Sequence, residues 1–201
     1  MRKLEDEAEL TLTRLFTGQP FRLDPDKQTV VATWLVMTSI VADYEDLNTV
    51  STHHMQRKAL FNNRKPPKQG WTVWIGYHPR ARWTPTYTIA PFLYLRPEIL
   101  AKRSSDLVTH YNSSISTQII GEFFIQVTHA PKPFPLDKWH FPPLPEGGIL
   151  RRIWPGGQYS LLWPPRPMSD FDVHVATNAL RIYMIRSALT SRYPEYLPDY
   201  A

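Results

Sequence analysis

The sequence predicts an α+β fold, in which a central, mostly antiparallel sheet is packed by N-terminal helices and a long C-terminal helix. Apolar residues recur at helical spacing near both ends of the chain, and from Trp71 onward the spacing changes to the alternation typical of strands. We expect a single domain over 1–201, with a helical part over 1–64, a β-rich part over 70–165 and a C-terminal helix over 168–192.

The first eighteen residues predict an amphipathic helix. Gly18 supplies the left-handed residue that commonly ends a helix. The helix opens at Met1 without a capping residue, which leaves its first amide groups without partners, so we expect that a preceding segment once supplied them. The apolar residues of one helical face are Leu4, Ala8, Leu12 and Leu15.

A second helix follows, with Asp24 as the N-cap and Pro25 and Asp26 in its first turn. It should be mostly buried, because its apolar face is broad. A third helix is expected to begin near Ser51 and to stop before Pro66. The apolar face of the second helix comprises Val30, Val31, Trp34, Leu35, Met37, Ile40, Val41 and Tyr44.

Strands are expected from Trp71 onward, where Trp71, Val73 and Ile75 alternate with their neighbours. Pro91 makes the second strand an edge or bent strand. The Gly156–Gly157 pair predicts a hairpin between the last two strands. A proline-rich connection over 130–148 is expected to pack as an extended segment. The further strands are expected over 87–95, 107–111, 119–128, 149–154 and 159–163.

A final helix is expected from Ser169 to Ser191, because Ser169 and Asp172 have the spacing of a capping box. Its core face would comprise Phe171, Val175, Ala179, Ile182, Ile185 and Leu189.

The composition excludes several classes of protein. The chain of 201 residues contains no cysteine, which excludes a disulfide framework, thiol catalysis and thiolate zinc sites and fits a reducing compartment. The longest apolar run, over 30–41, is too short to cross a bilayer, and acidic residues occupy the place of a secretory signal. We therefore expect a cytoplasmic protein with no membrane partner and no cofactor.

The start of the chain resembles a region of uncharacterised bacterial and phage proteins. The resemblance lies in the sequence RKLEDEA over 2–8, Gly18, then Gln28 and Trp34 in an apolar helix, and a Pro-Pro stretch ahead of Trp71 and Trp74. In that group this region follows an HNH-endonuclease-like zinc module that contains cysteines. The resemblance covers roughly the first 80 residues and implies an accessory region of such a nuclease.

The metal-binding part of that family has no counterpart in the chain. Met1 stands where the zinc module would end, so none of the module's Cys and His positions can be carried over. The chain is then either a stand-alone relative of the accessory region, or part of a longer reading frame. We expect no hydrolytic activity from this chain alone, and no metal site.

Histidines are the first candidates for catalysis. His53 and His54 are adjacent, so on a helix their side chains diverge by about 100° and do not easily share a metal. The alternative is a polar helix N-terminus on the surface. His110, His129 and His140 lie near strands and, with Glu122 or Asp106, would form an acid–base or metal site if the fold brought them together. Otherwise each hydrogen-bonds a backbone carbonyl.

A basic and aromatic stretch over 57–82 is the stronger candidate site. Cations bind phosphates and aromatic rings stack on bases, so the stretch predicts contact with DNA or RNA. The alternative is that the tryptophans lie in the core and the cations only solubilise the surface. The proposed nucleic-acid contacts are Arg57, Lys58, Arg64, Lys65, Lys68, Trp74, Arg80 and Arg82, with Trp71, Tyr77 and Trp83 nearby.

The sequence thus favours a non-catalytic accessory or binding module that contacts nucleic acid. Two other functions stay open: an HNH-related, metal-dependent nuclease or a fragment of one, and a protein–protein interaction component of a phage or defence system. Salt dependence separates the first hypothesis from the last, because phosphate contacts weaken steeply with salt.

Overall fold

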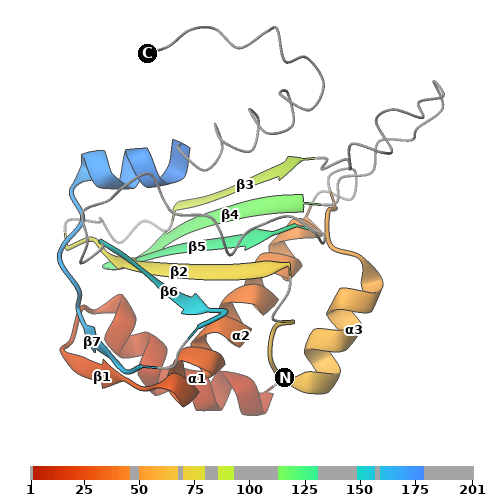
Figure 1. Ribbon diagram of the computed structural model, residues 1–201, viewed down its shortest axis with the longest axis horizontal. Coiled ribbons are helices and arrows are strands. Elements are labelled where there is room, and N and C mark those ends of the chain that lie inside the picture. The colour runs from red at the N-terminus through yellow and green to blue at the C-terminus, as the bar shows by residue number, and fades with distance from the viewer. Residues whose placement is uncertain are drawn as a thin grey trace, which may run out of the picture.

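The computed structural model describes residues 2–45, 50–67, 70–79, 86–92, 113–130, 149–156 and 159–178. Within them, helices cover both faces of an antiparallel sheet, as the α+β prediction requires (Figure 1). Helices α1 (Arg2–Phe16) and α2 (Pro25–Asp43) lie on one side of the sheet, and a helix over 170–178 lies on the other. No helix among these residues is long and apolar enough to cross a membrane.

The main sheet has five strands in the order β3-β4-β5-β2-β6, and every neighbouring pair is antiparallel. A separate two-stranded sheet pairs β1 with β7. The strands are β1 (Phe21–Leu23), β2 (Trp71–Tyr77), β3 (Thr86–Phe92), β4 (Ser113–Ile120), β5 (Phe123–His129), β6 (Leu150–Trp154) and β7 (Leu161–Trp163).

The larger core lies between α1, α2 and the sheet. Strand β2 contributes Trp71, Val73 and Ile75, which face the same side as Val127 and Ile125 of β5. A smaller cluster lies on the other face. It joins Phe124 and Ile149 to Met168, which precedes the helix over 170–178, and to Ala176 within that helix. The sheet is therefore covered on both faces.

The predicted ends of the first two helices are confirmed. Gly18 has φ +63°, and the amides of Gly18 and Gln19 reach back to the carbonyls of Leu15 and Arg14, as in a Schellman motif. The Asp24 side chain accepts a hydrogen bond from the amide of Lys27, 2.9 Å away, which satisfies an amide of the first turn of α2. Val41 is an exception to the predicted apolar face, because it is 61% exposed.

Helix α3 (His54–Asn63) begins three residues after the predicted start and ends before Pro66, as predicted. It stands beside the sheet rather than on a face of it (Figure 1). Edge strand β3 contains Pro91, in agreement with the sequence.

Two strand predictions are wrong. The expected strand over 119–128 is split by a two-residue turn at Gly121 and Glu122, which joins β4 to β5. The predicted hairpin at Gly156 is absent from the described residues, because β6 pairs with β2 whereas β7 pairs with β1.

The last predicted helix is confirmed at its start. Ser169 and Asp172 form the reciprocal cap, with the Ser169 hydroxyl 2.6 Å from an Asp172 carboxylate oxygen. Ala176 is buried and Val175 of the predicted core face is half-buried, whereas Phe171 is 73% exposed, so the prediction is wrong for Phe171. The other residues of that face lie outside the described residues. The expected continuation to Ser191, the strand over 107–111 and residues 131–148 of the proline-rich connection lie outside the described residues.

Candidate functional site

Helix α3 and the two residues after it carry half of the predicted nucleic-acid contacts. Arg57, Lys58, Arg64 and Lys65 are all exposed. The chain over 50–67 contains these four cations and no Asp or Glu. Lys68, Arg80 and Arg82 lie outside the described residues.

The aromatic part of the predicted interface lies elsewhere. Trp74 is 5% exposed and Trp71 is 2% exposed, because both occupy β2, an interior strand between β5 and β6. Neither indole therefore offers a free face for a base, and Trp74 does not belong to this surface. Phe61 of α3 is 70% exposed and was not predicted as a contact.

One side of α3 gathers the exposed groups. His54, Arg57, Lys58 and Phe61 follow the spacing that places residues on a single helical face, which we call the α3 face. Leu60, 8% exposed, belongs to the side that packs on the core. The Arg57 guanidinium lies 4.3 Å from the centre of the Tyr44 ring, so an aromatic ring supports this cation.

The start of α3 is built by a histidine cap. His53 Nδ1 accepts a hydrogen bond from the Met55 amide, and the Gln56 side chain accepts one from the His53 amide at 3.0 Å. The rings of His53 and His54 lie 4.2 Å apart and are exposed. Among the described residues, no group of three or more His, Asp or Glu side chains is placed to hold a metal ion.

Two buried polar contacts fix α3 to the rest of the protein. The carboxylate of Asp43, at the end of α2, accepts hydrogen bonds from the Ser51 amide at 3.0 Å and the Thr52 amide at 2.9 Å. The amide nitrogen of Gln56 lies 2.6 Å from Nε2 of His129, at the end of β5. The α3 face is therefore held in place from two sides.

His129 itself is buried and stacks on Trp71, with ring centres 4.4 Å apart. Burial lowers the pKa of His129 to about 4, so the ring is neutral at pH 7. It does not meet Glu122, because the two residues flank opposite ends of β5, about 20 Å apart at the rise of a strand. His110, His140 and Asp106 lie outside the described residues.

Glu122 lies instead beside Tyr77, at the far end of β2. Burial, together with the charge of Glu122 and a hydrogen bond to it, raises the pKa of Tyr77. The fold therefore does not bring His129 and Glu122 together in an acid–base site. The hydrogen bond of His129 runs to the side-chain amide of Gln56, whereas the alternative expected a backbone carbonyl.

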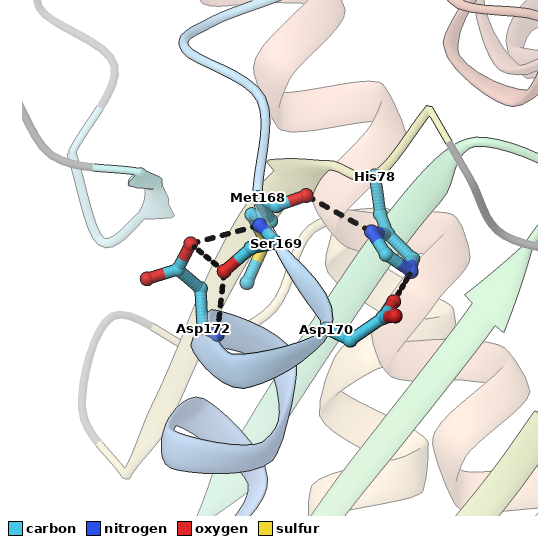
Figure 2. A network of polar contacts seen from close by, with 5 residues as sticks. All are labelled: His78, Met168, Ser169, Asp170 and Asp172. Carbon is cyan, nitrogen blue, oxygen red and sulfur yellow. Dashed lines mark hydrogen bonds and ion pairs between the residues drawn. The ribbon is translucent and has the colours of Figure 1, made fainter.

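A second histidine contact, which the sequence analysis did not single out, lies at the end of β2 (Figure 2). His78 is 5% exposed; its Nδ1 lies 3.0 Å from the Met168 carbonyl oxygen and its Nε2 lies 3.2 Å from the Asp170 carboxylate. Since a carbonyl only accepts, Nδ1 carries a proton. The nearby Ser169 hydroxyl donates to Asp172, on the side away from His78, so this cluster fastens the helix over 170–178 rather than activating a nucleophile.

Comparison of the chain with protein-family models, with curated proteins and with solved structures gave no match.

Proposed function

We propose that this protein is a binding module that contacts nucleic acid through the α3 face and the two cations that follow it. The observation that carries the proposal is charge. The four exposed cations over 57–65 have no carboxylate within 50–67 to neutralise them. A phosphate backbone is the partner that such a surface attracts most strongly.

The defined position of the surface in the folded protein supports the same function. The Asp43 carboxylate holds the residues before α3, and Gln56 ties the helix to the sheet. The Tyr44 ring lies against the Arg57 guanidinium and positions it. A preorganised cationic surface loses less conformational entropy when it binds.

The proposal involves no catalytic step. An accessory role beside a nuclease, which the resemblance of the first 80 residues implies, is compatible with it and remains part of the proposal. A protein partner is the competing function, because Met55 and Phe61 are 57% and 70% exposed.

The test compares two pairs of cations in a fluorescence anisotropy titration with labelled DNA and RNA oligonucleotides. In one variant, Lys58→Ala and Lys65→Ala remove two cations from the proposed interface. In the matched control, Arg22→Ala and Arg152→Ala remove the same charge from exposed positions on β1 and β6. The first variant should bind at least tenfold more weakly, whereas the control should stay close to the unmodified protein.

The salt dependence gives a second readout. The slope of log affinity against log salt should become shallower by about 2 in the Lys58/Lys65 variant, because each phosphate contact contributes about one unit. No binding by the unmodified protein, or equal losses in both variants, would refute nucleic-acid binding through this surface and favour a protein partner.

A further inference from the structure

Phe61 occupies the middle of the cationic segment. Arg57 and Lys58 precede it by four and three residues, and Arg64 and Lys65 follow it by three and four. The first two lie one helical turn from the ring on the α3 face. The helix ends at Asn63, and Arg64 closes it with its amide hydrogen-bonded to the Leu60 carbonyl at 2.9 Å. In the sequence, an aromatic residue therefore stands between two pairs of cations, and the first pair shares the α3 face with it.

The core does not require that ring. Leu60 supplies the buried apolar contact of α3, whereas Phe61 is 70% exposed. Exposed apolar residues are common on their own, so exposure alone says little. The position of Phe61 beside Arg57 and Lys58 on the α3 face, just ahead of two further cations in the sequence, is what points to a ligand with both charge and flat apolar faces.

We infer that the α3 face binds single-stranded rather than double-stranded nucleic acid, with Phe61 as a stacking platform for an unpaired base. This inference rests on the proposed nucleic-acid function. In a duplex the faces of the bases are covered by their neighbours, and a phenyl ring has no polar atom to read base edges in a groove. A single strand presents base faces and phosphates together, which matches a ring flanked by cations.

The experiment titrates the full chain against a labelled single-stranded oligonucleotide and against the duplex of the same sequence and length. The unmodified protein should bind the single strand more tightly at equal salt. Phe61→Ala should weaken single-strand binding by about five- to a hundredfold and leave duplex binding unchanged, because stacking on one base contributes on that scale.

Two substitutions separate stacking from general apolar contact. Phe61→Trp keeps an aromatic face and should retain the affinity, whereas Phe61→Leu keeps an apolar side chain and should bind as weakly as Phe61→Ala. Because Phe61 is exposed, all three variants should fold, which a circular dichroism melt verifies.

An abasic strand of the same length supplies the matched probe, since it keeps the phosphates and lacks the bases. The unmodified protein should bind it as weakly as Phe61→Ala binds the normal strand, and Phe61→Ala should bind both strands equally. Equal affinity for single strand and duplex, or full affinity in Phe61→Leu, overturns the stacking role. If the Lys58/Lys65 variant is still impaired in that case, the proposed function stands, whereas no binding by the unmodified protein to any probe overturns both.

Discussion

The buried ring of His129 makes one short hydrogen bond, between Nε2 and Gln56, and its Nδ1 has no partner among the described residues. Gln56 Oε1 already accepts from the His53 amide, so the Gln56 amide nitrogen donates to His129 Nε2 and the proton of the imidazole must lie on Nδ1. That Nδ1 is buried and has no hydrogen-bond partner among the described residues. Protonation of Nε2 would remove the acceptor that holds α3 and would place a charge in the core.

The stability of the protein should therefore fall on acidification. Burial lowers the pKa of His129 from 6.5 to about 4 in the folded state, so between these values the unfolded chain binds a proton that the folded protein does not. Above pH 6.5, His129 does not make the free energy of unfolding depend on pH. As the pH falls from 6.5 to 4, the free energy of unfolding should decrease by about 3 kcal/mol. Urea unfolding of the unmodified protein and of His129→Gln at pH 7 and pH 4.5 measures the difference. Equal pH dependence in both proteins would contradict the assignment.

At the scale of single elements, the position of α3 depends on the end of α2. Asp43 is the last residue of α2 and places a carboxylate at the negative end of the helix dipole, which is unfavourable by itself. The Ser51 amide, the Ser51 hydroxyl and the Thr52 amide all donate to it. This contact fixes the residues that lead directly into α3.

Asp43→Asn should loosen that connection. Both amides donate to the same oxygen, Oδ2, so an Asn oxygen in that place can still accept from them, but without a negative charge. The NH2 group that replaces Oδ1 cannot accept from the Ser51 hydroxyl. Because hydrogen bonds to a charged acceptor are stronger than those to a neutral one, the free energy of unfolding should fall by about 1–3 kcal/mol. Nucleic-acid affinity should fall as well, because the α3 face is no longer held. Glu45→Gln removes the same charge at an exposed site two residues away and serves as the control. Thermal melts and oligonucleotide titrations of the two variants provide the comparison, and equal behaviour would show that Asp43 does not position α3.

Local sequence patterns predicted the elements that depend on local physics. The Schellman end of α1, the Asp24 cap and the Ser169–Asp172 cap involve residues close in sequence, so spacing and residue type were sufficient. The hairpin at Gly121 was missed because apolar residues continue on both sides of it. Tertiary contacts with α1 position this turn. The Glu122 amide donates to the Phe16 carbonyl, 2.8 Å away, and a Cβ on Gly121 would collide with that oxygen.

The candidate site was predicted only in part, for the same reason. The cations of α3 were found because charged residues lie at the surface wherever the helix packs. The sequence analysis looked for aromatic contacts at Trp71 and Trp74, which lie buried in the sheet, whereas Phe61, the residue that we propose for stacking, lies on the helix itself. The pairing of β7 with β1 and the contact of Gln56 with His129 join residues far apart in the chain, which no local pattern reveals.

The whole molecule divides into a core with many buried apolar side chains and helix α3, which a few polar contacts hold in position. Helix α2 buries nine residues against α1 and the sheet, and these elements share one hydrophobic cluster. Helix α3 has one buried residue, Leu60, and is otherwise held by the contacts of Asp43 and Gln56. Regions with few buried apolar contacts open locally before the global unfolding transition.

Amide hydrogen exchange should be faster in α3 than in the core elements. Amides of α2, β2 and β5 should exchange only through global unfolding, whereas amides of α3 should exchange faster because a local opening that breaks few contacts exposes them. A bound single-stranded oligonucleotide should slow exchange in α3, since it binds the closed form and stabilises it by mass action. Mass spectrometry of peptides from 50–67 and from α2, with and without the oligonucleotide, measures both effects. Protection by the oligonucleotide in α2 or β6 but not in 50–67 would place the ligand elsewhere on the protein. Equal exchange of α2 and α3 without the oligonucleotide would show that the protein opens as one unit.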